Sequence, residues 1–146
     1  GITLPSVAKP LAAYVPAVRT GNLVYTSGQL PLEGGEIAHT GKVGADGASG
    51  SVTPEQAKVA ARQCALNALA AIDALVGIDS VTRIVQVVGV VASSPGFSGQ
   101  PGVVNGASEF LGEVFGDAGV HARSAVGVAE LPLDAPVEVE LIVEVV

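Results

Sequence analysis

Arg123 is the first side chain in this sequence whose type and position could support chemistry. It lies in Val120-His121-Ala122-Arg123-Ser124, at the start of a predicted strand. A guanidinium donates two parallel hydrogen bonds to a carboxylate, so one interpretation is a clamp for a small carboxylic acid. The alternative is structural, with the aliphatic stem packed and the charge reaching a carboxylate at the rim.

Glu138 and Glu140 are the second candidates, because they share one face of the last predicted strand. A carboxylate in a cleft can hold or deprotonate a water molecule, which suits hydrolysis. The alternative is a solvated face without a catalytic role. The pattern alone leaves both interpretations open.

The remaining reactive side chains, on Ser27, Cys64 and Tyr14, give weaker indications of a functional site. Ser27 would need a base to act as a nucleophile, and neither His39 nor His121 stands in a nucleophile-elbow context. Cys64 lies in the apolar stripe of a predicted helix and is expected to be an inert core residue. Tyr14 could either pack in the core or present its hydroxyl to a ligand.

Composition excludes several classes of site and partner. One cysteine and two histidines without paired spacing argue against structural zinc, and no Walker-type loop is present. The net charge of −7 argues against nucleic acid and anionic membranes as partners. No uninterrupted apolar run approaches the ~20 residues of a membrane span. A single cysteine and no signal pattern predict a reducing, cytoplasmic location.

Local patterns predict an irregular arm over residues 1–13, followed by seven helices and strands. A Gly-rich loop over residues 31–50 separates the second of these elements from the third. Thr20-Gly21-Asn22 predicts a hairpin, and Thr53-Pro54-Glu55-Gln56 predicts a capped helix that ends at Gly77. The predicted strands are 14–19, 23–29, 81–92, 123–129 and 137–145, and the predicted helices are 54–76 and 103–115. The Val-rich strand 81–92 is expected to be buried on both faces. The last two strands flank a predicted turn over residues 131–136.

The last strand has the clearest pattern. Its odd-numbered residues from Val137 to Val145 are apolar, whereas three of the alternating positions are glutamates. The order β-β-α-β-α-β-β predicts an α+β fold with a mostly antiparallel sheet and two helices on one face. The 146 residues predict one domain over 1–146, and only 14% of them are charged. So few charges favour a surface partly covered by identical copies.

Two ordered motifs resemble the Rid family (reactive intermediate deaminase, also called YjgF or L-PSP-like). The first runs from Tyr14 to Pro31 and includes Thr26-Ser27-Gly28-Gln29. The second runs from Ala122 to Pro132, with Ala122-Arg123-Ser124 at its start, and is followed by Val137-Glu138-Val139-Glu140. With the helix and strand between them, the resemblance covers nearly the whole chain.

The resemblance implies a chorismate-mutase-like fold assembled as a homotrimer with a cleft at each subunit boundary. It implies hydrolysis of enamines and imines of small 2-amino acids to 2-keto acids and ammonia, without metal or organic cofactor. By position, Arg123 would clamp the substrate carboxylate and Glu138 would position the attacking water. Tyr14, Ser27 and Asn105 would bind substrate.

The sequence also departs from the family pattern. Ala12-Ala13-Tyr14-Val15-Pro16 replaces Gly-Pro-Tyr-Ser-Gln, Ala125 replaces a common cysteine, His121 replaces a usual proline, and the loop 94–102 is longer. The altered surroundings of Tyr14 favour an alternative function, non-catalytic binding of a small carboxylate or keto acid. A ribonuclease or translation inhibitor is disfavoured by the negative charge and by the presence of only five aromatic residues.

Overall fold

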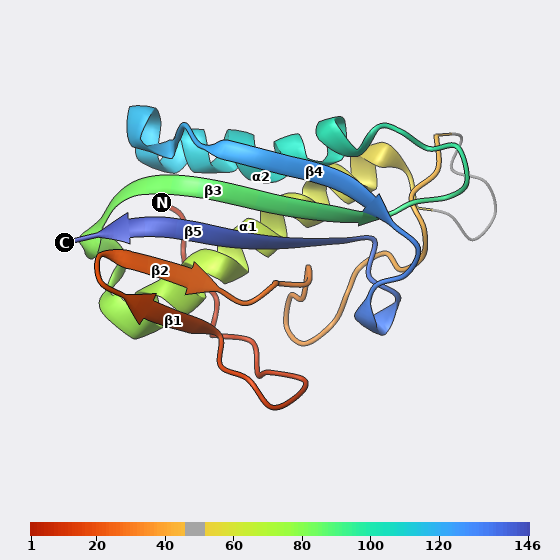
Figure 1. Ribbon diagram of the computed structural model, residues 1–146. Helices are drawn as coiled ribbons and strands as arrows, with labels where there is room; N and C mark the ends of the chain where they lie inside the picture. The colour runs from red at the N-terminus through yellow and green to blue at the C-terminus, as the bar shows by residue number, and fades with distance from the viewer. Residues whose placement is uncertain (46–51) are drawn as a thin grey trace.

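The computed structural model describes residues 1–45 and 52–146, which form one sheet with two helices on one of its faces (Figure 1). The elements follow the predicted order. They are β1 (Ala17–Thr20), β2 (Leu23–Thr26), α1 (Pro54–Val76), β3 (Val81–Ala92), α2 (Gln100–Phe115), β4 (Ala122–Val128) and β5 (Val137–Val145), with short 3-10 turns at 78–80, 116–119 and 132–134.

The strand order in the sheet is β1-β2-β5-β3-β4. Three of the four pairings are antiparallel, as the sequence predicts, whereas β3 and β4 run parallel. Although β4 and β5 follow each other in the chain, β3 lies between them. The reason is that α2 connects β3 to β4 as a crossover, which requires β4 to be parallel to β3. This leaves β4 at one edge of the sheet and β1 at the other.

The β1–β2 hairpin is shorter than predicted. Thr20 pairs with Leu23, so the loop is Gly21-Asn22, with Gly21 at φ 56°. Tyr14 lies before the first strand rather than within it. In the predicted loop 31–50, Val43 makes isolated bridges to Val52 and Ser93, and residues 46–50 lie outside the described part of the chain.

Local caps define the two helices. The Thr53 hydroxyl accepts a hydrogen bond from the Gln56 amide at 3.1 Å, and the Gln56 side chain accepts one from the Thr53 amide at 3.0 Å. This capping box begins α1, and Gly77 ends it at φ 82°. Helix α2 begins at Gln100, three residues before the predicted start, because Pro101 is tolerated in the first turn.

One hydrophobic core lies between the helices and the sheet. The odd-numbered residues of β5, from Val137 to Val145, are all buried, and they pack in one core with α1 and with Phe110 of α2. Ile142 lies on the opposite face of β5 and is partly exposed. The prediction that β3 is buried on both faces is wrong for the single chain. Val87 and Val91 are buried under the helices, whereas Val88 on the opposite face is partly exposed, because residues 1–45 and 52–146 form no layer there.

Helix α1 satisfies the length and hydropathy criteria for a membrane-crossing helix, although it has no long uninterrupted apolar run. Half of its most apolar window is buried inside the fold. Its alanines, among them Ala57, Ala61 and Ala68, pack in the core. The apolar residues of α1 are therefore explained by the packing of one helix face in the hydrophobic core.

Candidate functional site

Arg123 is held by three neutral oxygen atoms, two of them on side chains of α2. Its side chain lies on the helix side of the sheet, since Arg123 pairs with the buried Val87 of β3. Nη1 donates to Asn105 Oδ1 at 2.7 Å and to Ser108 Oγ at 3.2 Å, and Nη2 donates to the Pro101 carbonyl at 3.3 Å. We call Arg123, Asn105, Ser108 and the Pro101 carbonyl the arginine cluster.

No carboxylate among the described residues pairs with Arg123. The ion pairs in that part of the chain are Lys42–Glu130, Lys58–Glu109 and Arg62–Glu113. A guanidinium has five N–H groups, so further donors of Arg123 remain available. The structural interpretation, in which Arg123 reaches a carboxylate at the rim, is therefore not supported.

The arginine cluster also contains residues to which the sequence did not point. Ser108 follows Asn105 by three residues, and residues at this spacing share a helix face, which is the signal that could have found it. The Pro101 carbonyl belongs to the loop 94–102, whose end becomes the first turn of α2. Asn105 lies where a substrate-binding residue was predicted, and here its side-chain oxygen orients Arg123.

Glu138 forms a second group with the segment that follows β2. Gln29 and Val139 exchange backbone hydrogen bonds of 2.8 and 3.0 Å, so this segment runs alongside β5. A Cβ atom at Gly28 would overlap the Glu138 carboxylate, so a side chain there would displace the Glu138 carboxylate from its present position. The sequence motif contains Gly28, but only the structure shows that it lies against Glu138.

Ser27 precedes Gly28 in the chain and Tyr14 lines a hollow with Gly28, and we call Glu138, Gly28, Ser27 and Tyr14 together the glutamate cluster. Ser27 Oγ donates to the Val15 carbonyl at 2.6 Å, which ties the Tyr14 segment to the end of β2. Tyr14 is 46% exposed and therefore not a core residue, and it lines a small hollow together with Gly28. The Leu11 amide donates to the Tyr14 hydroxyl at 3.1 Å.

The glutamate cluster has an unusual electrostatic environment. Burial raises the pKa of Glu138 above the ordinary glutamate value, and the neighbouring charge of Glu140 raises it further. Burial also raises the pKa of the Cys64 thiol, with a smaller effect from Glu138. Cys64 is thus a buried neutral thiol, as expected for a core residue. Among residues 1–45 and 52–146, no group of three His, Cys, Asp or Glu side chains is arranged to hold a metal ion.

The two clusters lie on opposite faces of the sheet. Arg123 bonds to α2 on the helix face of the sheet. Glu138 lies between the buried Val137 and Val139 and therefore points to the opposite face, which we call the open face because α1 and α2 do not cover it. The strands β4 and β5 are also separated by β3. Within one chain, therefore, Arg123 and Glu138 do not face a common cleft.

The chain is similar to known proteins over its whole length. Residues 5–145 match the family model described as Endoribonuclease L-PSP. Protein TCP17 of Trypanosoma cruzi is 44% identical over 99% of this chain and 88% of its own length. A protein of unknown function from Agrobacterium tumefaciens, Atu1372, is 45% identical, with a TM-score of 0.89 over 100% of this chain and 87% of that one.

A more distant solved structure connects the fold to a named group of proteins. The YjgF gene product of E. coli is 28% identical, with a TM-score of 0.64 over 96% of this chain and 98% of that one. The mixed sheet, the two helices on one face and the family-model match agree with the resemblance found in the two sequence motifs. The chain therefore belongs to the L-PSP family, also known as the YjgF family.

Proposed function

We propose that this protein hydrolyses enamines and imines of small 2-amino acids to 2-keto acids and ammonia, in clefts formed between identical copies. The observation that carries the proposal is Arg123, a cation held by three neutral oxygens and without an acidic partner among the described residues. Such an arginine is preorganised to bind an anion, and a carboxylate fits its planar fork.

The separation of the two clusters supports the inference that the site lies between copies. Arg123 is on an edge strand and Glu138 is on the open face, so one chain cannot bring both to the same small molecule. A second copy docked against the open face could place its arginine cluster near this glutamate cluster. We propose the homotrimer that the family resemblance implies as the assembly that does so.

The proposed reaction uses water and needs no metal or organic cofactor. An enamine first takes a proton on carbon and becomes an imine. Glu138 then holds a water whose oxygen attacks the imine carbon while a proton moves to the nitrogen. This gives a carbinolamine, whose hydroxyl proton then moves to the amine. As the C–N bond breaks, ammonia leaves and the carbonyl of the keto acid remains. A carboxyl with a raised pKa is suited to this role, because it gives and takes protons nearer to neutral pH.

The alternative is a protein with the same fold that binds a small carboxylate or keto acid without catalysis. Arg123 supports both functions equally, whereas the half-buried Glu138 supports the enzyme. Action on RNA, which the family name suggests, is not favoured, because a net charge of −7 opposes binding to a polyanion.

The test compares ammonia release with ligand binding in two variants. Glu138→Gln keeps the shape and removes the charge, so it should lower ammonia release from an enamine generated in situ by about 100-fold or more. Its affinity for a small keto acid, measured by calorimetry, should change little. Arg123→Lys should weaken that affinity about tenfold, because lysine lacks the planar fork.

Two results would contradict this assignment in different ways. If the unaltered protein releases no ammonia above the spontaneous rate but binds the keto acid through Arg123, it is a binding protein. If Arg123→Lys leaves keto-acid affinity unchanged, Arg123 is not the carboxylate site. Arg19→Lys is a matched control, since Arg19 is exposed and its side chain donates to the Gly21 and Val146 carbonyls.

A further inference from the structure

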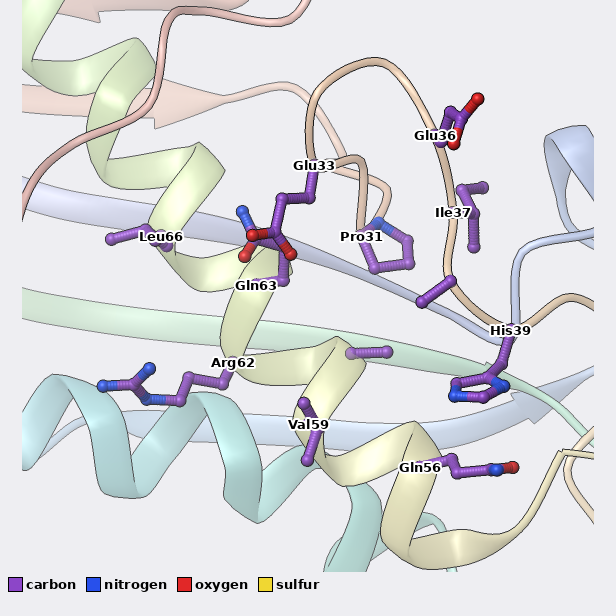
Figure 2. A pocket seen from close by; sticks show the side chains of 12 residues that line it. Pro31, Glu33, Glu36, Ile37, His39, Gln56, Val59, Arg62, Gln63 and Leu66 are labelled. Atoms are coloured by element: carbon purple, nitrogen blue, oxygen red, sulfur yellow. The ribbon is translucent and has the colours of Figure 1, made fainter.

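A groove of about 670 Å³ lies between the outer face of α1 and the segment 31–39, away from both clusters (Figure 2). Its volume is within the range of small-molecule sites, roughly 300–1,000 Å³. Its lining on α1 extends from Gln56 to Leu66, which corresponds to about 15 Å along the helix axis. The apolar part of the lining comes from both walls and consists of Pro31, Ile37, Ala38, Val59, Ala60 and Leu66.

The groove is preformed, because a buried polar side chain fastens one wall to the other. Asn67 is 4% exposed, and its Nδ2 donates to the Leu30 carbonyl at 3.0 Å and to the Leu32 carbonyl at 2.9 Å. Gln63 Nε2 adds a longer bond to the Leu32 carbonyl at 3.4 Å. These bonds fix the segment 30–32 on α1, so the groove does not depend on a ligand to form.

Glu33 is placed over this groove by a tight turn. The Glu33 and Glu36 backbones exchange hydrogen bonds of 2.9 and 3.2 Å around Gly34 and Gly35, whose φ values are 60° and 82°. Two consecutive residues with positive φ are typical of the rigid two-residue turn of a hairpin. Glu33 and Glu36 both line the groove. In Figure 2 the Glu33 side chain reaches toward Gln63 of α1, whereas Glu36 lies at the far side of the turn from α1.

The ionisable side chains that line the groove are Glu33, Glu36, His39 and Arg62, so its formal charge is negative when histidine is counted as neutral. Glu33 forms no ion pair with any described residue. Arg62 stands at one end of the groove but is engaged with α2, where its guanidinium lies 4.8 Å from the Phe110 ring centroid and 4.0 Å from Glu113. Val59 on the α1 wall of the groove is 72% exposed, so its apolar side chain is available to contact a ligand.

We propose that this groove binds a small organic ammonium compound, with its apolar body on Val59 and Leu66 and its charge on Glu33. An unpaired carboxylate beside an apolar surface matches a primary amine that carries an alkyl or aryl chain. Such a site is separate from the proposed reaction, because the groove shares no residue with the arginine or glutamate cluster.

The probe for this proposal is hexylamine, with hexanol and hexanoate as comparisons of the same chain length. Calorimetry should show hexylamine binding at least tenfold more tightly than hexanol, and hexanoate should bind more weakly still. Glu33→Gln should weaken hexylamine binding about tenfold. Val59→Ser should also weaken it, because it removes apolar contact area. Asp117→Asn is the matched control and should change the affinity less than twofold, since Asp117 is exposed and does not line the groove.

The proposal is overturned if hexylamine binds no better than hexanol, or if Glu33→Gln leaves its affinity unchanged. Binding of an oligolysine peptide without binding of hexylamine would overturn it too, because the groove would then be a docking surface for a macromolecule. Arg123→Lys distinguishes this site from the proposed catalytic one. It should leave hexylamine affinity unchanged, whatever its effect on keto-acid binding.

Discussion

Arg123 and Glu138 show how the fold can prepare two charges for different tasks. Arg123 has its guanidinium oriented by neutral acceptors, so its charge is kept without being neutralised. Glu138 is half-buried beside another carboxylate, so its charged form is disfavoured. One side chain is therefore fitted to bind an anion, and the other to exchange a proton.

The raised pKa of Glu138 predicts a pH dependence of stability. Folded Glu138 holds its proton more tightly than the unfolded chain does, so its contribution to the free energy of unfolding falls as pH rises from about the ordinary value of 4.5 through the raised pKa. Glu138→Gln removes this loss. The free energy of unfolding of the variant minus that of the parent should therefore be larger at pH 7.5 than at pH 3.5, as measured by urea denaturation at both pH values.

A substitution that involves no titratable group offers a control for this measurement. Gly112→Ala should show the same stability difference from the parent at both pH values, because neither side chain titrates. An equal difference for Glu138→Gln would mean that the folded environment does not disfavour the Glu138 charge.

At the scale of elements, the close contact of α1 and α2 sets the position of the arginine cluster. Gly106 lies next to Asn105, and a Cβ there would overlap the backbone carbonyl of Lys58 on α1. Because the obstructing atom is backbone, the helices would have to move apart. The orientation of Asn105 toward Arg123 thus depends on the absence of a side chain at the neighbouring position.

Gly106→Ala should therefore destabilise the protein by about 1–3 kcal/mol, the usual cost of overpacking. It should also weaken keto-acid binding, since Asn105 would shift. Gly112→Ala is the matched control in the same helix, because a Cβ there meets nothing within 4 Å. The control should be neutral or stabilising by up to about 1 kcal/mol, through helix propensity. Equal thermal stabilities for the two variants would contradict the close-packing argument.

At the scale of the whole molecule, the open face of the sheet is the surface that remains to be covered. Val18, Tyr25 and Val126 are each at least 40% exposed, on the edge strands β1 and β4 and on β2. In Figure 1 the sheet lies in front of both helices, and none of the helices and strands that the structure describes lies over its front face. Exposed apolar side chains and two free strand edges favour contact with further copies.

We predict a homotrimer, so light scattering should give about three times the chain mass of 14.4 kDa. Val126→Asp places a charge on the open face and should shift the protein toward the monomer, with loss of ammonia release. Val114→Asp on the exposed side of α2 should leave the mass unchanged. A stable monomer of 14.4 kDa in the unaltered protein would remove both the trimer and the site between copies.

The sequence by itself determined the elements and the candidate residues. Capping signals at Thr53 and Gly77 act within a few residues, and alternation along Val137–Val145 shows which side of β5 is buried. The two motifs also identified the family and pointed to Arg123 and Glu138, since these rest on residue type and order. Such signals are local, so they can be read without knowing which strands pair.

Only the tertiary structure decided how those residues are combined. It placed β3 between β4 and β5, and by pairing Arg123 with the buried Val87 it put Arg123 on the face opposite to Glu138. It showed that Ser108 orients Arg123 and that Gly28 makes room for Glu138. These contacts join residues 15 and 110 positions apart in the chain. Their formation depends on packing between distant segments, and no local spacing encodes that packing.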